Sequence, residues 1–544
     1  MNRRLSDAGP ALLFLVALSV CLVAHLSGLG GSFLSDDFVH AKLIADAQGR
    51  GELSNWLIER LYLPLGSGNF AYRPVAFASY ALDWFLFGTS AWGWHLSNLL
   101  IHLLNAALVL ILALRLGRRV QTGNEYFVAM AVAAMFLAIP FAGETTFWPV
   151  GRFDLLACMF SLLFLILLTG MPAQAGFWSM ASRKITMLAC MLLALLSKES
   201  AMPMLAVGFA LVFALRLPDH YEAGTTTGAI LSTAMKEALA RYWPVFVLAF
   251  VYFAWRYWIF GSPWKVYPSS QFPGPAEFLS RVTVLKHVFT YPWAGLAGFW
   301  WALIALAAGT WLSGLPGAFK RAGTPVLLLT LVLFFCFIGY LFAPATSFPV
   351  ATVNGEGIRN LYFPWMLFSL FVGFALAHHR FRFWILSIML VIAMWGQWRL
   401  VDLWQDSAAE MLRITAAIPA LAENISDEQY VLLLLPDHVS AVPFARNAQG
   451  SIVMPPVQPV SFLSVMAPMT ALQFAEWEKH LQTNIIGELK GGVVFDRRRF
   501  VGVYCWQPVQ GQFHLLETMP HPNHAEDWEA KTMSEATQAG CLLK

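Results

Sequence analysis

The chain has 544 residues, of which 58% are hydrophobic and only 12% are charged, whereas about a quarter of the residues of an average soluble protein are charged. This deficit excludes a soluble globule, a disordered chain and a nucleic-acid-binding protein, because the charged surface that each of them needs is missing. The formal net charge is only +3 and indicates no partner by itself. The composition therefore predicts a membrane protein.

Apolar stretches recur from residue 11 to residue 399, several of them near the roughly 20 residues that cross a bilayer core of about 30 Å. We expect an α-helical polytopic membrane protein with about 11 transmembrane helices, near residues 11–30, 95–114, 126–140, 153–170, 185–197, 199–215, 242–260, 293–313, 324–343, 360–377 and 383–399. The first stretch has the basic start of a signal peptide but no small-residue cleavage site after it, so we expect it to stay as the first helix.

Lys and Arg gather in alternate loops, and such loops are usually cytoplasmic. The basic positions are Arg3 and Arg4, then Arg115, Arg118 and Arg119, then Arg183 and Lys184, then Arg216 and Arg241, then Lys320 and Arg321, then Arg380 and Arg382. With an odd number of spans, loops 31–94 and 261–290 and the segment after Arg399 then lie outside. This pattern predicts a multi-pass protein of the inner (cytoplasmic) membrane whose C-terminal part is periplasmic or otherwise extracytoplasmic.

After about residue 400 the composition becomes that of an ordinary soluble domain. We therefore expect two domains, a transmembrane catalytic domain of residues 1–400 and a C-terminal soluble α/β domain of residues 401–544. Strands are expected at 430–435, 451–454 and 493–495, and a helix at 471–481. Cys505 and Cys541 both fall in this tail, and whether they form a disulfide stays open, because spacing alone does not bring their Cα atoms within reach.

The first outer loop opens with two adjacent carboxylates, Asp36 and Asp37, immediately after the first span. An Asp at this place can cap a helix or face the lipid headgroups. A carboxylate shielded from bulk water at the membrane boundary can also have its basicity adjusted by burial and by its neighbours, as a general base requires.

Further charges lie at the same expected face. The second outer loop holds Glu144, Trp148, Arg152 and Asp154, and the later outer junctions hold Lys198, Glu199 and Arg359. An Arg at the boundary can be a snorkelling anchor, but its planar fork also suits a phosphate. Carboxylates and cations gathered at one outer face are what sugar transfer from a lipid phosphate needs.

Several of these segments resemble the multi-spanning glycosyltransferases of the GT-C class. They are most similar to the transmembrane and tetratricopeptide-containing protein O-mannosyltransferases and their bacterial relatives. The matching segments, in the family's order, are Asp36-Asp37, Tyr72-Arg73-Pro74, the stretch 95–105, the run from Glu144 through Trp148 and Arg152 to Asp154, Ser197-Lys198-Glu199, and Arg359-Asn360-Leu361-Tyr362. They cover about the first 400 residues, and the ordered set is more specific than any one of them.

The resemblance implies a polyprenyl-phosphate sugar donor and inverting transfer on the extracytoplasmic side. An acidic residue of the first outer loop would be the base, and Asp37 is slightly favoured over Asp36. Glu144 would bind the acceptor, orient a basic side chain or assist the acid/base step. Arg152, Lys198 and Arg359 would bind the donor phosphate. Substrate-binding positions would be Tyr72, Arg73, Trp148, Asp154, Glu199 and Tyr362. The acceptor, a protein hydroxyl or an envelope glycan, stays open.

The chain also departs from the family. Two histidines that often flank the second-loop Pro and precede its Glu are here Ile139 and Gly143, and no 34-residue repeat occurs between 400 and 544. Metal use is open: the paired Asp residues could hold Mg²⁺ or Mn²⁺ through oxygen ligands, but no separate ligand set requires one.

Two more polar groups have weaker functional interpretations. His95, His102 and Asn105 share a helix face, and polar contacts between helices are favoured there over a metal site or a proton relay. The stretch from His521 to Asp527 contains residue types that bind metals, but a surface loop is the favoured interpretation.

The alternative function is a transporter or flippase of lipid-linked sugars. Transporters often carry internal repeats and broken helices near the membrane midplane. Here the polar groups lie in loops at one face, and no inverted duplication is evident, which favours an enzyme.

Overall fold

A computed structural model describes residues 2–63, 72–170, 177–220, 227–263, 274–283, 297–343, 357–440, 442–470, 473, 486–489, 493–496, 499–516 and 528–541. Within these ranges nine helices are long and apolar enough to cross a membrane. They lie in α1 (Asn2–Gly28), α5 (Ala91–Arg119), α7 (Arg152–Thr169), α8 (Phe177–Ser197), α9 (Met204–Arg216), α10 (Thr227–Phe260), α13 (Ala297–Phe342), α14 (Tyr362–Leu376) and α15 (Arg382–Glu423). The chain is an α-helical polytopic membrane protein with a C-terminal sheet region.

Two of the eleven expected spans are not among these nine. The stretch 126–140 forms α6 (Glu125–Leu137), which has only 13 residues. The stretch 293–313 begins outside the described residues and continues on the first half of α13, which bends at Gly323 where φ is 74°. The helix expected at 126–140 is therefore present, but it is shorter than the other spans.

Helix α6 is buried because it is apolar on every side. Nearly all of its residues from Phe127 to Leu137 are inaccessible to solvent, as expected of a helix without a polar face. It packs against α1, α5 and α14. Gly373 of α14 permits the close approach, because a Cβ atom there would lie 2.3 Å from the side chain of Val132.

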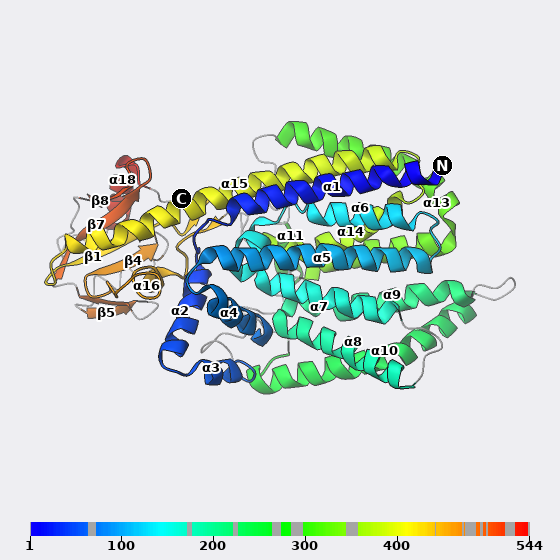
Figure 1. Cartoon of the computed structure of the whole chain (residues 1–544), viewed down its shortest axis with the longest axis horizontal. Coiled ribbons are helices and arrows are strands. Elements are labelled where there is room, and N and C mark those ends of the chain that lie inside the picture. Colours follow the sequence, from blue (N-terminus) through cyan, green and yellow to red (C-terminus); the bar gives the residue numbers. More distant parts are fainter. Residues whose placement is uncertain are drawn as a thin grey trace.

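Polar elements gather at one end of the helix bundle. Figure 1 shows the C-terminal sheet at that end, with α2 (Asp36–Gly49) and α3 (Leu53–Glu59) beside it and the N terminus at the other end. Helix α4 (Pro74–Phe87) connects this region to the start of α5. We call this the outer end of the bundle, after the orientation expected from the basic loops.

The second outer loop adopts two short irregular helices. A single π-helical turn, η1 (Gly143–Phe147), is followed by the 3-10 turn η2 (Pro149–Gly151), and every residue of both is buried. Isolated π-helical turns are rare and occur frequently at functional sites. Gly151 lies against the preceding turn, because a Cβ atom there would lie 2.3 Å from the Glu144 carbonyl oxygen and 2.4 Å from that of Thr145.

The C-terminal region contains a four-stranded sheet in the order β4-β1-β7-β8. Its central strands, β1 (Tyr430–Leu435) and β7 (Phe500–Gln507), are parallel to each other; β4 (Met466–Thr470) is also parallel, and β8 (Gln512–Leu516) pairs antiparallel with β7. Every residue of β1 is buried, which explains its uninterrupted apolar sequence. Two smaller ladders pair β2 (His438–Val439) with β3 (Val442–Pro443), and β5 (Ile486–Leu489) with β6 (Val493–Asp496).

Two of the three strands expected in the C-terminal region are present, and the third is wrong. The strands at 430–435 and 493–495 coincide with β1 and β6. The strand expected at 451–454 is wrong, since Gln449–Ile452 forms the short helix α16 and a turn follows. The helix expected at 471–481 lies outside the described residues except for Gln473, and so does the His521–Asp527 stretch.

Helix α15 continues well past residue 400 before the sheet begins. It ends at Glu423, and β1 starts at Tyr430. We therefore propose that the boundary between the membrane domain and the C-terminal domain lies between these two residues. The extension of α15 contacts the sheet directly, because Arg413 donates to the Pro508 carbonyl over 2.9 Å.

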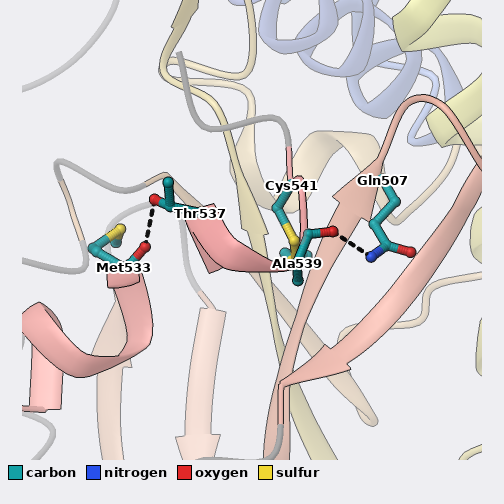
Figure 2. The surroundings of a disulfide bond; sticks show 6 residues. Gln507, Met533, Thr537, Ala539 and Cys541 are labelled. Atoms are coloured by element: carbon teal, nitrogen blue, oxygen red, sulfur yellow. Dashed lines mark hydrogen bonds between the residues drawn. A yellow bond between two sulfur atoms is a disulfide. The ribbon is translucent and has the colours of Figure 1, made fainter. Parts of the chain in front are cut away.

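A disulfide joins Cys505 of β7 to Cys541, which follows α18 (Trp528–Gln538). The two Cα atoms are 5.8 Å apart although 36 residues separate them in the chain. Figure 2 shows that the amide of Gln507 also donates to the Ala539 carbonyl, over 2.6 Å. The disulfide and this hydrogen bond together tie the end of the chain to the sheet.

Gly151→Ala is predicted to disturb the second outer loop. The new methyl group would overlap two backbone carbonyls, and we expect a loss of stability of about 1–3 kcal/mol, as for other overpacked sites, measured as a lower thermal unfolding temperature in detergent. Gly30→Ala is the matched control at the same end of the bundle, because no atom lies within 4 Å of its Cβ position. Equal stability of the two variants would contradict the tight packing of this loop.

Candidate active site

Asp37 connects the first outer loop to the second. Its side chain is only 1% exposed. One carboxylate oxygen accepts the Leu34 N–H over 3.1 Å and the other accepts the Val150 N–H over 3.0 Å. Burial raises the pKa of Asp37, and the two N–H groups oppose this rise. Both oxygens are thus engaged in holding the two loops together.

Asp36 lies at the edge of the site and is only partly buried. Its Oδ1 accepts a hydrogen bond from the Asn447 side-chain amide over 2.8 Å. Asp36 also acts on His40, one turn further along α2. Burial lowers the pKa of His40 to about 4; the charge of Asp36 opposes this shift, and that of Arg73 adds to it. Asp36 and Arg73 are therefore both within electrostatic range of the same imidazole.

Arg73 belongs to a buried group centred on Glu199. Its Nε atom lies 3.0 Å from Glu199 Oε2, while the Tyr72 N–H donates to Oε1 over 2.9 Å. Arg256 of α10 lies 3.6 Å from the same carboxylate. Arg256 was not expected as a site residue, although a lone Arg within an apolar span is a sequence signal for a functional or paired position.

Lys198 follows α8 and lies between Asp154 and the other cations. Its Nζ atom is 2.6 Å from Asp154 Oδ2, and Ser200 donates to Oδ1 over 3.2 Å. Burial lowers the pKa of Lys198; Asp154 opposes this shift, whereas the charges of Arg359 and Arg73 strengthen it. The pKa of Lys198 is therefore sensitive to the charges of both Arg73 and Arg359.

Glu144 of η1 holds the segment that carries Arg359. It is fully buried, and it accepts the N–H groups of Gly357 over 2.9 Å and of Arg359 over 3.0 Å. The Arg359 guanidinium lies 3.5 Å from the same carboxylate and 4.9 Å from the centre of the Trp148 ring. With 20% of its side chain exposed, against 11% for Arg73 and 8% for Lys198, Arg359 is the most accessible of the three cations.

Each buried carboxylate of this group has a cation beside it. Glu144 pairs with Arg359, Asp154 with Lys198, and Glu199 with Arg73 and Arg256. Cationic groups held in a region of low dielectric interact strongly with anions.

Arg152 occupies a separate and deeper position. It forms an ion pair with Asp83 and donates over 2.8 Å both to the Asn98 side chain and to the Trp94 carbonyl. Only 1% of Arg152 is exposed. These contacts hold α4, α5 and α7 together, so the phosphate-binding role expected from the sequence stays a prediction that the geometry does not favour.

Tyr362 points into the bundle rather than toward the cations. Its hydroxyl lies 2.8 Å from His102 Nδ1 and accepts the Asn105 amide over 3.2 Å. Asn105 also donates to the Leu155 carbonyl over 3.0 Å. These bonds link α5 to α14 and α7 and fit the polar helix contact expected for His102 and Asn105.

Both carboxylate oxygens of Asp37 accept backbone N–H groups, and Oδ1 of Asp36 accepts the Asn447 amide, so three of the four oxygens of the pair face hydrogen-bond donors. Across the residues that the structure describes, no three His, Cys, Asp or Glu side chains gather as metal ligands would.

Comparisons with known proteins find relatives of limited extent. No model of a known protein family matches the chain. A stretch of 154 residues is 32% identical to the protein O-mannosyl-transferase Tmtc2 of Drosophila melanogaster and covers 27% of this chain and 16% of that protein. A stretch of 157 residues is 28% identical to the protein O-mannosyl-transferase F38B6.6 of Caenorhabditis elegans and covers 28% of this chain and 22% of that protein.

Two solved structures also align with the chain at low similarity. The crystal structure of ArnT from Cupriavidus metallidurans bound to undecaprenyl phosphate has a TM-score of 0.43 and 15% identity, and covers 86% of this chain and 90% of that one. Its apo structure has a TM-score of 0.44 and 14% identity, and covers 80% and 84%. The two sequence relatives confirm the resemblance to protein O-mannosyltransferases that the motifs indicate, over about a quarter of the chain.

Proposed function

We propose that the chain is a membrane glycosyltransferase of the GT-C type, which transfers a sugar from a polyprenyl-phosphate donor to an acceptor hydroxyl on the extracytoplasmic side. The observation that carries the proposal is a set of three buried ion pairs at one end of the helix bundle, which join Arg73 to Glu199, Lys198 to Asp154 and Arg359 to Glu144. The outward orientation rests on the basic loops at the opposite end, where Arg119 pairs with Asp219.

The three cations would bind the donor phosphate. A phosphate that enters beside Arg359 exchanges the phosphate's own water shell for charged hydrogen-bond donors. Such contacts are strong in a site of low dielectric. As the bond to the sugar breaks, the phosphate gains negative charge, and the cations stabilise it as the leaving group. The prenyl chain would lie in the bilayer beside the helices. No Gly-rich nucleotide-binding motif occurs in the sequence, which agrees with a lipid-linked donor.

Asp36 would act as the base. It takes the proton from the acceptor hydroxyl as the acceptor oxygen bonds to the anomeric carbon. The bond from that carbon to the phosphate oxygen breaks with its electron pair staying on the phosphate, so one displacement inverts the anomeric centre. The names of the two relatives make mannose the first sugar to test; a protein hydroxyl or an envelope glycan is the acceptor.

The contacts favour Asp36 over Asp37 for this step, in contrast to the slight preference drawn from the sequence. Both oxygens of Asp37 accept backbone N–H groups in the interior, so an acceptor hydroxyl would have to displace one of them. Asp36 is only partly buried, and it influences the pKa of His40 together with Arg73. We therefore assign Asp37 a positioning role between the two loops.

The remaining predicted residues would act through these groups. Glu144 orients Arg359, Asp154 orients Lys198, and Glu199 orients Arg73 beside Tyr72. Trp148 supports the Arg359 guanidinium, while Arg152 and Tyr362 hold the surrounding helices.

Asp36→Asn is expected to lower the rate of sugar transfer from a polyprenyl-phosphate sugar by about 100-fold or more, as the loss of a general base does. Membrane insertion and thermal stability should stay as in the natural protein. Transfer of radiolabelled sugar in proteoliposomes measures the rate. If neither the natural protein nor any variant transferred sugar, and Asp36→Asn lost the movement of sugar across the vesicle membrane, the result would instead indicate a transporter or flippase.

Asp37→Asn is expected to destabilise the protein. The amide supplies one acceptor oxygen, so either the Leu34 or the Val150 N–H faces a second donor, at a cost of about 1–3 kcal/mol for the unsatisfied group. Thermal unfolding of the purified variants measures this difference. If Asp37→Asn were as stable as the natural protein and inactive, while Asp36→Asn stayed active, the two assignments would have to be exchanged.

Arg359→Ala is expected to raise the KM for the lipid donor about 10-fold or more, since a hydrogen bond to a charged group contributes about 1.5–3 kcal/mol. The KM for the acceptor should change little. Arg380→Ala, which removes an exposed Arg from the loop between α14 and α15, serves as the control. An equal rise in both KM values would contradict a role in phosphate binding.

A further inference from the structure

A segment of the C-terminal domain contacts the first outer loop at the candidate base. This segment, residues 444–447, follows β3. The Ser35 N–H donates to the Phe444 carbonyl over 2.7 Å, and the Ser35 hydroxyl donates to the Arg446 carbonyl over 2.6 Å. The Asn447 amide donates to Asp36 Oδ1 over 2.8 Å. Three hydrogen bonds therefore connect two parts of the chain that lie 411 residues apart.

The backbone on both sides of this contact adopts conformations that ordinary residues avoid. Ser35 has φ of 49° and Asn447 has φ of 61°. Positive φ is unfavourable for residues with a Cβ atom, but Asn tolerates it better than most. Such conformations persist when surrounding contacts impose them, and they cluster at functional sites.

Buried apolar side chains of both segments also support the contact. Phe444, Ala445 and Ala448 are almost fully buried, and they belong to the same apolar cluster as Phe33 and Leu34 of the first outer loop. A shared core holds the two segments in one fixed arrangement, so the Asn447 amide is presented to Asp36 by rigid elements.

The geometry at Asp36 leaves one oxygen for chemistry. Asn447 occupies Oδ1, and across the residues that the structure describes no other hydrogen bond to the Asp36 side chain is present. An amide that donates to one oxygen restricts the rotation of the carboxylate and so limits the directions in which Oδ2 can accept a proton. A displacement of a reacting group by about 1 Å can cost about 100-fold in rate.

We propose that Asn447 is a positioning residue for Asp36, and that the C-terminal domain thereby forms part of the catalytic centre. This inference rests on the proposed function, because it assumes that Asp36 accepts the proton of the acceptor hydroxyl. Asn447 does not touch the donor phosphate; it acts through the carboxylate.

Two variants of the full-length protein test the proposal. Asn447→Gly retains a residue suited to positive φ and removes the amide. Asn447→Asp also tolerates positive φ, but it places a second carboxylate against Asp36. In proteoliposomes, kcat for sugar transfer should fall about 10-fold in the Gly variant and further in the Asp variant, while the KM for the lipid donor stays unchanged.

Ser440→Gly is the matched control, because Ser440 is an exposed residue of the same domain with φ of 54°. Its kcat should equal that of the natural protein. If a merely structural role applied, the Gly and Asp variants would lose thermal stability and donor affinity together with kcat, and the proposal would be overturned. If the Gly variant does not fold, the folded Asp variant carries the same test of kcat against KM.

These experiments distinguish a failure of the Asn447 proposal from a failure of the assignment of Asp36 as the base. Loss of activity in Asp36→Asn with full activity in both Asn447 variants would refute the role of Asn447 and keep the proposed function. Full activity in Asp36→Asn would refute the assignment of the base itself, whatever the Asn447 variants do.

Discussion

The site depends on the cost of burying charge at a membrane boundary. An ionised group removed from water is tolerated only when an opposite charge and further hydrogen bonds compensate it. Glu144, Asp154 and Glu199 meet this condition, since each lies within an ion pair and accepts further hydrogen bonds. The carboxylates in turn hold Arg359, Lys198 and Arg73 in place. The ion pairs therefore permit the burial, and under the proposed function they also hold the cations in place for a phosphate without rearrangement.

The second structural requirement is that several distant segments meet at the outer end of the bundle. Asp37 links the first loop to the second, Glu144 links the second to the start of α14, and Asn447 links the C-terminal domain to the first. Each link uses a hydrogen bond to a carboxylate, which is stronger and more directional than a bond between neutral groups. The loops consequently behave as one unit, although they belong to four separate parts of the sequence.

Much of the architecture follows from the sequence because hydrophobic length and charge placement are local properties. The apolar runs predict most of the spans, and the basic loops predict which elements share an end. Helix α6 is the shortest of the expected spans that the structure describes in full: its 13 residues are apolar and buried among neighbouring helices. The run Ser451–Met454 was misassigned because four residues carry too little periodicity to separate a strand from a short helix.

The partners of the site residues were harder to predict, because they depend on contacts between distant segments. The motifs indicate Lys198, Glu199 and Arg359, but nothing local indicates that Arg256 shares Glu199 with Arg73, or that Asp83 neutralises Arg152. Asn447 carries no motif at all. Only the fold distinguishes Asp36, held at one oxygen, from Asp37, which is held at both.

The most direct test of the central claim is the affinity of the purified protein for a polyprenyl phosphate compared with the uncharged polyprenol of the same length, measured in nanodiscs. We expect the phosphate to bind at least about 10-fold more tightly, a difference of about 1.4 kcal/mol. Added salt should weaken this preference only partly, because the cations are buried. Equal affinities for the phosphate and the alcohol would contradict a phosphate site at the outer end of the bundle.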